Sequence, residues 1–327
     1  MQQSKPLHTQ FQRQDAGYWS RQAWVWVCIV GLGLWHSTMP PNAAASPALP
    51  QRNGEAELSA AQTQLLKTIH TARIIYLGET HDHEPDHRAE LTILQGLYRF
   101  NPQLVVAMEM FQRPYQPAID RYLQGSSSET DLLEGTQFQQ RWGYNWSFYA
   151  PIVRFAQKKG LPVLAINAPT ETTRKVARFG LEALTPEDTA WTPPAAEIET
   201  HSPSYRQRLQ DIFNSFHQGK GNSKGFEHFV QAQALWDETM ADAIAQYHVQ
   251  NPQRQIVVLV GQGHLWADGL PSRVGRRLKQ IQGQNIQQEI VLLNPPQSAL
   301  GEPLQGTENP RKWVWITADR SCIRDNC

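Results

Sequence analysis

Short runs of β-branched and apolar residues alternate with longer stretches of helical periodicity over most of this 327-residue chain. This alternation is typical of an α/β fold, in which helices connect the strands of a mainly parallel sheet and flank it. The runs expected to form strands are residues 73–77, 104–108, 162–166, 256–260, 289–293 and 313–317. The stretches expected to form helices are about 58–70, 86–100, 115–124, 147–159 and 226–249.

The interval 170–225 contains no strand-like run and includes a proline-rich patch at 192–194. An insertion of this length inside an α/β fold is expected to be helical and to lie over the edge of the sheet as a cap. We therefore expect a single domain over 46–327, with a cap at about 170–225, a loop at 294–310 and a last strand at 313–317.

Residues 1–45 have the composition of a targeting segment. Residues 1–22 are polar, and the apolar run that follows, 23–35, has thirteen residues. A membrane-spanning helix needs about 20 apolar residues, so the run better fits the hydrophobic region of a signal peptide, with small residues at 43–45 as a cleavage site. We expect an exported, periplasmic protein. Because the polar segment before the run is long, an N-terminal membrane anchor that is not cleaved remains the alternative.

The charges of the chain balance: thirty Lys and Arg residues stand against thirty Asp and Glu residues, so the formal net charge is zero. A nucleic-acid-binding protein that neutralises phosphates needs a basic surplus or a basic stripe, and the sequence has neither. Three cysteines exclude a disulfide-rich scaffold and a zinc module of four thiolates. Cys322 and Cys327 either pair in an oxidising compartment or stay free.

Polar side chains follow four of the predicted strands. In chain order they are Glu79 and His81, Glu109, Asn167, and His264. Because the carboxyl ends of parallel strands meet at one edge of a sheet, we expect these residues to form a histidine and carboxylate cluster there. Gly78 and Gly261 each stand three residues before one of the histidines, and glycine lets the backbone turn tightly and present the side chain.

Such a cluster has three chemical uses. His81, Glu109 and His264 are candidates to ligate a divalent metal. The same three residues and Glu79 are candidates for general acid and base catalysis. Third, such residues can bind the polar groups of a ligand without catalysing a reaction. Asp237, on the helix expected at 226–249, and Asn167 are expected to support the cluster as neighbours of its members.

The segment His83-Glu84-Pro85-Asp86-His87 matches the His-Glu-x-x-His pattern of zinc proteases. That pattern works when both histidines lie on one face of a continuous helix. Proline is unfavourable in the interior of a helix but common in its first turn. We therefore expect a helix that begins near Pro85, with His83 before it and His87 in its first turns, and no zinc-protease site.

Several other polar residues are expected to have ordinary structural roles. The aromatic stretch 141–149 is a candidate wall for a flat apolar ligand, although core packing is the commoner reason for such a stretch. The arginines after the fourth strand are expected on a solvated face rather than beside a carboxylate: Arg273, Arg276 and Arg277. His228 and His248 are expected at the surface of the helix at 226–249.

Five motifs occur in this chain in the same order as in a known family. They are Leu77-Gly-Glu-Thr-His81, Met108-Glu109-Met-Phe-Gln-Arg113, Ala165-Ile-Asn-Ala-Pro169, Trp236-Asp-Glu-Thr-Met240 and Gly261-Gln-Gly-His264. The chain therefore resembles the ChaN-like family of haem-binding uptake proteins in the Tiki superfamily, over roughly 60–290. The resemblance implies an α/β core with a helical cap, and an exported, often lipid-anchored homodimer that serves haem or iron acquisition. Cys28 lies within the apolar run and does not fit a lipoprotein site.

The wider superfamily includes the Tiki metalloproteases and the erythromycin esterases. In these enzymes, two Gly-x-x-His motifs and a glutamate at a strand end form the reactive centre. By this resemblance His81 and His264 match the two histidines, Glu79 matches the acid within the first motif, and Glu109 matches the acid of the second strand. The fold class implied is therefore Tiki or erythromycin-esterase-like.

Two functions follow, and whether the protein is an enzyme stays open between them. The first is an exported haem-binding protein, with haem as the cofactor or cargo, an axial tyrosine or histidine, and Arg113 and Tyr149 as candidate contacts in the pocket. The second is a hydrolase of an ester or peptide-like bond, dependent on a divalent metal or assisted by the His and Glu cluster. A third interpretation treats the cluster as a structural polar network in an exported binding domain.

Overall fold

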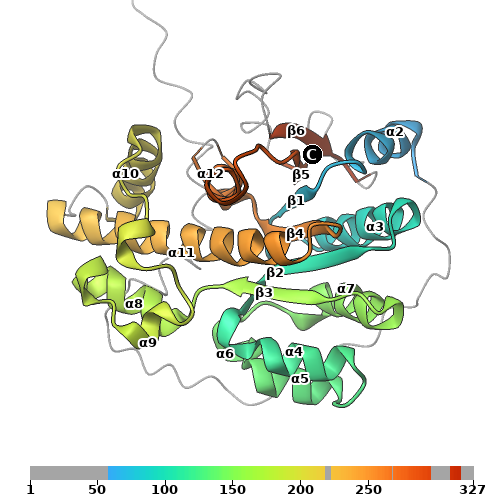
Figure 1. Ribbon diagram of the computed structural model, residues 1–327, viewed down its shortest axis with the longest axis horizontal. Coiled ribbons are helices and arrows are strands. Elements are labelled where there is room, and N and C mark those ends of the chain that lie inside the picture. The colour runs from blue at the N-terminus through green and yellow to red at the C-terminus, as the bar shows by residue number, and fades with distance from the viewer. Residues whose placement is uncertain (1–57, 218–221, 267, 296–309, 318–327) are drawn as a thin grey trace, which may run out of the picture.

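The computed structural model describes residues 58–217, 222–266, 268–295 and 310–317. Its centre is a six-stranded sheet in the order β3-β2-β4-β1-β5-β6, in which every pair of neighbours is parallel (Figure 1). The strands are β1 (Ile74–Glu79), β2 (Leu104–Gln112), β3 (Val163–Asn167), β4 (Gln255–Gly261), β5 (Gln288–Leu293) and β6 (Arg311–Trp315). The predicted α/β class with a mainly parallel sheet is confirmed.

The central strands are continuous apolar runs because helices bury both of their faces. In β1, Ile75 and Leu77 belong to one apolar core, while Ile74 and Tyr76 belong to the core on the opposite face. The first core is shared with a group of helices along one face: α2 (Ala60–Ile69), α3 (Glu84–Phe100), α4 (Gln116–Leu123), α5 (Glu129–Thr136), α6 (Phe138–Arg141) and α7 (Trp146–Lys159). The second core is shared with α11 (Ser223–Gln250) and α12 (Leu270–Gln282).

The predicted cap is helical. Between β3 and α11 the described residues form α8 (Thr170–Phe179), α9 (Pro186–Thr189), α10 (Pro203–His217) and short 3-10 turns, with no strand among them. A third apolar core joins α8 and α10 to the first half of α11, through residues such as Val176, Leu209 and Leu235. Figure 1 shows these cap helices beside the first half of α11, at the opposite end of the molecule from α2 and α3.

The start of α3 agrees with the sequence argument about proline. His83 is the N-cap residue, and Pro85 lies in the first turn, where its missing N–H leaves no helical hydrogen bond unmade. His83 thus precedes the helix and His87 lies within it. The two histidines do not share one helix face in the manner of a zinc protease.

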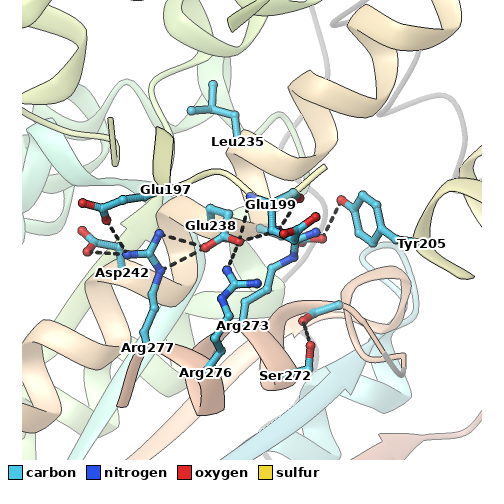
Figure 2. A network of polar contacts seen from close by, with 12 residues as sticks. Glu197, Glu199, Tyr205, Leu235, Glu238, Asp242, Ser272, Arg273, Arg276 and Arg277 are labelled. Atoms are coloured by element: carbon cyan, nitrogen blue, oxygen red, sulfur yellow. Dashed lines mark hydrogen bonds and ion pairs between the residues drawn. The ribbon is translucent and has the colours of Figure 1, made fainter. Parts of the chain in front are cut away.

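One network of charges between α11, α12 and the cap corrects the expectation about the arginines of α12 (Figure 2). Glu238 is fully buried and binds three arginines of α12: Arg273 at 2.5 Å, Arg277 at 2.8 Å, and Arg276. Arg273 and Arg277 are themselves buried, so the expectation of a solvated arginine face was wrong for these two. Burial raises the pKa of Glu238, but the three guanidinium groups outweigh it and lower the pKa.

The same network binds a loop of the cap, which contains Glu197 and Glu199, to α12. Arg273 donates 3.0 Å to the carbonyl oxygen of Glu199, and Arg277 lies 3.1 Å from the carboxylate of Glu197. The cap is therefore held to α12 by charge as well as by its apolar core. The expectation that His248 lies at the surface was also wrong, since this residue is only 3% exposed.

Several predictions concern residues outside the described part of the chain. These are the targeting segment at 1–45, the cysteines Cys28, Cys322 and Cys327, and most of the loop at 294–310. Among the helices that the structure describes, none is both long enough and apolar enough to cross a membrane.

Candidate functional site

The end of β1 positions the first part of the site. Glu79 is the last residue of the strand and is fully buried, and its Oε1 lies 2.5 Å from Nδ1 of His81. The hydroxyl of Tyr149 on α7 donates to the same oxygen at 3.1 Å. Burial alone would lower the pKa of His81, but the hydrogen bond to Glu79 and the charge of Glu109 raise it above its ordinary value. Glu79 therefore fixes the ring and favours its protonated form.

His81 is the most accessible histidine of the cluster. Its side chain is 12% exposed, against 2% for His87 and 3% for His264. No hydrogen bond to its Nε2 is formed within the described part of the chain. The rings of Trp142 and Tyr144 lie 4.7 Å and 5.2 Å from the imidazole, centre to centre. Two aromatic side chains thus lie beside a ring whose Nε2 has no hydrogen bond within the described residues.

Gly261, at the end of β4, allows the imidazole of His81 to pack against the backbone. A Cβ atom at this position would lie 2.8 Å from both Cε1 and Nε2 of His81. The Gly261 φ angle is −58°, which any residue adopts, so the need for glycine here is the close approach rather than the backbone conformation.

A second set of hydrogen bonds and ion pairs holds His264 in place. Its Nδ1 lies 2.5 Å from Oδ1 of Asp237 on α11, and its Nε2 lies 3.3 Å from Oε1 of Glu109. The hydroxyl of Tyr205 on the cap helix α10 donates to the other oxygen of Asp237 at 2.9 Å. Burial would lower the pKa of His264, but the two carboxylates raise it to about 10. The ring is therefore an imidazolium held between two acids.

Glu109 lies between the two histidines. The strand β2 continues to Gln112, beyond its predicted end, and its register against β3 shifts between Met108 and Gln112. In this segment the carboxylate of Glu109 accepts the Gly261 N–H at 2.8 Å, and its carbonyl accepts the Asn167 amide at 2.7 Å. Burial raises the pKa of Glu109, but His264 and His81 lower it below its ordinary value.

The structure thus brings together the five residues predicted at the strand ends, Glu79, His81, Glu109, Asn167 and His264, with Asp237, the predicted neighbour. Tyr149 joins the same network through Glu79, and is fully buried. Arg113 is engaged elsewhere, since its guanidinium lies 2.9 Å from the carboxylate of Asp242 on α11.

His87 and Glu90 on α3 were not predicted as members of the cluster. The Nδ1 of His87 lies 3.1 Å from Oε2 of Glu90 and 3.1 Å from Oε2 of Glu79. Burial would lower the pKa of His87, but these two acids raise it to about 11. The pKa of the buried Glu90 is raised well above its ordinary value, by burial and by the charge of Glu79. The spacing of three residues on a helix was the available signal, because it places both side chains on one face.

The two ends of the cluster are connected to different parts of the fold. Glu79, His87 and Tyr149 belong to β1, α3 and α7, while Asp237 and Tyr205 belong to α11 and the cap. Tyr205 was not predicted as part of the site, since nothing local in the sequence pairs it with Asp237. The cap therefore supplies a side chain to the site.

The sequence profile of one protein family, described as "Haem-binding uptake, Tiki superfamily, ChaN", matches residues 65–274. The chain belongs to this family. The match extends from α2 into α12 and includes every residue of the cluster. The family membership expected from the five ordered motifs is thus confirmed.

A solved structure of another ChaN protein has the same fold. It is described as cofacial haem binding to ChaN of Campylobacter jejuni, and it is 18% identical, with a TM-score of 0.56 over 73% of this chain and 88% of that one. An erythromycin esterase in its open conformation is 13% identical, with a TM-score of 0.41 over 72% of this chain and 74% of that one.

A longer plant protein is also similar. It is the chloroplastic protein RETICULATA-RELATED 5 of Arabidopsis thaliana, 25% identical over 274 residues. The match covers 78% of this chain but only 35% of the plant protein. The chain therefore spans about a third of the length of this curated relative.

Proposed function

We propose that this protein is an exported haem-binding protein that serves haem or iron acquisition. The observation that carries the proposal is the ChaN family match over 65–274. The description of the related Campylobacter jejuni structure as cofacial haem binding supports the same function.

His81 fits the role of an axial ligand to haem iron. Imidazole is a common axial ligand, and a carboxylate on the other ring nitrogen orients such a ligand and raises its basicity. Glu79 stands in that position at 2.5 Å, and Trp142 and Tyr144 offer aromatic faces beside the open nitrogen. Haem would supply a redox-active iron at the site beside His81. The protein's own residues would orient the imidazole and line the porphyrin ring.

The two contacts expected from the sequence have other partners within the protein. Tyr149 is buried and donates its hydroxyl to Glu79, and burial raises its pKa well above the ordinary value. A neutral, buried phenol is a poor iron ligand, because ligation by tyrosine needs the phenolate. Arg113 is already neutralised by Asp242. Among the candidates, His81 therefore has the best geometry for ligation.

A haemin titration of the full chain, followed in the visible spectrum, tests the function. We expect a saturable Soret band with wild type and with His228→Ala, a control histidine on α11. With His81→Ala the band should be weaker or shifted. A flat titration of wild type would contradict haem binding, whereas an unchanged His81→Ala spectrum would contradict only the ligand.

A second function, hydrolysis of an ester or peptide-like bond, is supported by one observation. Both His81 and His264 are oriented through Nδ1 by a carboxylate at 2.5 Å, an arrangement that prepares Nε2 for proton transfer. The open Nε2 of His81 would take a proton from an attacking water, whose oxygen forms the new bond to the substrate carbonyl carbon, and would return that proton to the leaving group as the scissile bond breaks. The buried imidazolium of His264 would hold the carboxylate of Glu109 in place beside His81.

A panel of esters and short peptides tests this second function. We expect wild type to hydrolyse at least one member faster than His81→Ala, with His228→Ala equal to wild type. Equal rates for wild type and His81→Ala on every member of the panel would leave haem binding as the function of the cluster.

A further inference from the structure

Three buried side chains at the end of β1 gather in the geometry of a metal site. One donor atom each from Glu79, His87 and Glu90 lies within 4.8 Å of the other two. The residues are 0%, 3% and 0% exposed. No other group of three His, Cys, Asp or Glu residues in the described part of the chain meets this condition.

The hydrogen bonds of His87 determine which of its nitrogens faces the two acids. Its Nε2 lies 3.2 Å from the carbonyl oxygen of His81, which accepts but cannot donate, so Nε2 carries a proton. Nδ1 therefore faces carboxylate oxygens of Glu79 and Glu90 at 3.1 Å each. Acceptor atoms that face one another in a buried place need a positive charge between them. A proton on Nδ1 supplies that charge, and so does a metal ion that replaces the proton.

Two buried carboxylate oxygens of this group accept no hydrogen bond of good geometry. They are Oε1 of Glu90 and Oε2 of Glu79, and the latter has the ion pair with Nδ1 of His87 at 3.1 Å. Buried carboxylate oxygens without a well-formed hydrogen bond are costly, and a cation removes that cost for both of them together.

We propose that Glu79, His87 and Glu90 bind a divalent first-row metal ion, Zn²⁺ or Mn²⁺. One imidazole nitrogen with two carboxylate oxygens is a donor set for these ions rather than for Ca²⁺ or Mg²⁺, which prefer oxygen alone. Two carboxylates balance the charge of the ion when His87 is neutral. Donor atoms on a tetrahedral ion with bonds of about 2.1 Å lie about 3.4 Å apart, close to the 3.1 Å separations seen here.

The surroundings hold these ligands in place. The hydrogen bond from His87 Nε2 to a backbone carbonyl is the usual support of a metal-binding histidine. Phe148 stacks on the His87 ring at 4.9 Å, and Tyr149 packs against its edge at 4.7 Å. This site differs from the triple predicted from the sequence, and it does not depend on whether the protein binds haem.

Calorimetric titration of metal-free full chain with ZnSO₄ and with MnCl₂ tests the proposal. We expect one ion per chain for wild type and for Glu84→Gln, an exposed control on the same helix. Glu90→Gln keeps the shape and the hydrogen bonds of a protonated acid, so the apo Tm should stay near wild type while binding weakens at least about tenfold.

Glu109→Gln distinguishes the two possible metal sites. If the ion lies at Glu79, His87 and Glu90, Glu109→Gln binds as wild type does; if it lies at His81, Glu109 and His264, binding is lost, which would overturn the proposal. Absence of binding by wild type, or equal binding by Glu90→Gln and wild type, would also overturn it.

X-ray absorption of the Zn²⁺-loaded wild type gives a test that needs no variant. One imidazole with oxygen ligands is the expected first shell. Two imidazoles would place the ion at His81 and His264, and any sulfur would place it at the cysteines, so either result would contradict the proposal.

Discussion

The carboxylate of Glu79 lies 2.5 Å from Nδ1 of His81, only two residues further along the chain. The hydrogen bond assigns the Nδ1 proton and leaves Nε2 as the nitrogen available to a ligand or substrate. Asp237 holds His264 in the same way, but the Nε2 of His264 faces Glu109 and is buried. The two histidines are therefore alike in their support and different in access, since His81 is the more exposed of the two.

Glu79→Gln should move the pH dependence of haem binding to lower pH. The raised pKa of His81 means that Nε2 loses its proton, and becomes able to bind iron, only above its ordinary pKa of 6.5. Removing the charge of Glu79 removes a cause of that rise, so the midpoint should fall. Soret absorbance against pH measures the midpoint, and Glu84→Gln is the exposed control. A midpoint that stays constant or rises would contradict the role of Glu79.

Gly261→Ala should weaken haem binding without unfolding the protein. The new Cβ would lie 2.8 Å from two atoms of the His81 ring, so the ring must move away from its position on Glu79. Gly275→Ala on α12 is the matched control, because its Cβ would meet the end of the Gln288 side chain. Titration with haemin and a thermal melt separate binding from folding. Equal haem affinity in both variants would show that the ring position has no influence.

Asp237→Asn should destabilise the protein by about 3 kcal/mol, because removing one partner of a buried ion pair leaves the other charge uncompensated. The imidazolium of His264 would keep only Glu109, and Tyr205 would lose an ionised acceptor. Urea unfolding measures the change. Asp211→Asn, on the exposed side of α10, should change the free energy of unfolding by less than about 0.5 kcal/mol. Similar small losses in both variants would contradict the buried pair.

Stability should fall at alkaline pH, and His264 should account for part of the fall. Its pKa is raised from 6.5 to about 10 on folding, so its contribution is fully present below pH 6.5 and is lost as the pH rises through about 10. The slope from this group is at most about 1.4 kcal/mol per pH unit. Unfolding free energies at several pH values should show a shallower alkaline decline for His264→Gln than for wild type. Parallel curves would contradict the assignment.

Much of the sheet was predictable because buried parallel strands are continuous apolar runs. All six runs became strands, with ends that differ by a few residues at most except in β2. That strand was expected to end at residue 108 but continues to Gln112, since Glu109 and Gln112 look like loop residues in isolation. Glu109 stays in the buried strand because Gly261 and His264 supply its hydrogen bonds.

The arginines of α12 show why other features were not predictable. An arginine on an amphipathic helix normally faces solvent, and the local pattern gave no sign of a buried partner. Glu238 supplies that partner from α11, 35 residues before Arg273. His87 and Glu90 were missed for a related reason, because their partner Glu79 comes from a strand. Pairings across elements depend on the packing of the fold, which local periodicity does not contain.

Glu238→Gln should destabilise the protein by about 3–5 kcal/mol, since three arginines would lose their shared carboxylate and two of them are buried. Glu227→Gln removes a half-exposed acid that pairs with Arg206, and should cost less than about 1 kcal/mol. Both are measured by urea unfolding, with haemin titration as a second readout. Haem affinity should stay at the wild-type value in Glu238→Gln, because none of these arginines contacts His81. A loss below 1 kcal/mol in Glu238→Gln would mean that the apolar core shared by α8, α10 and α11, rather than the charge network, attaches the cap.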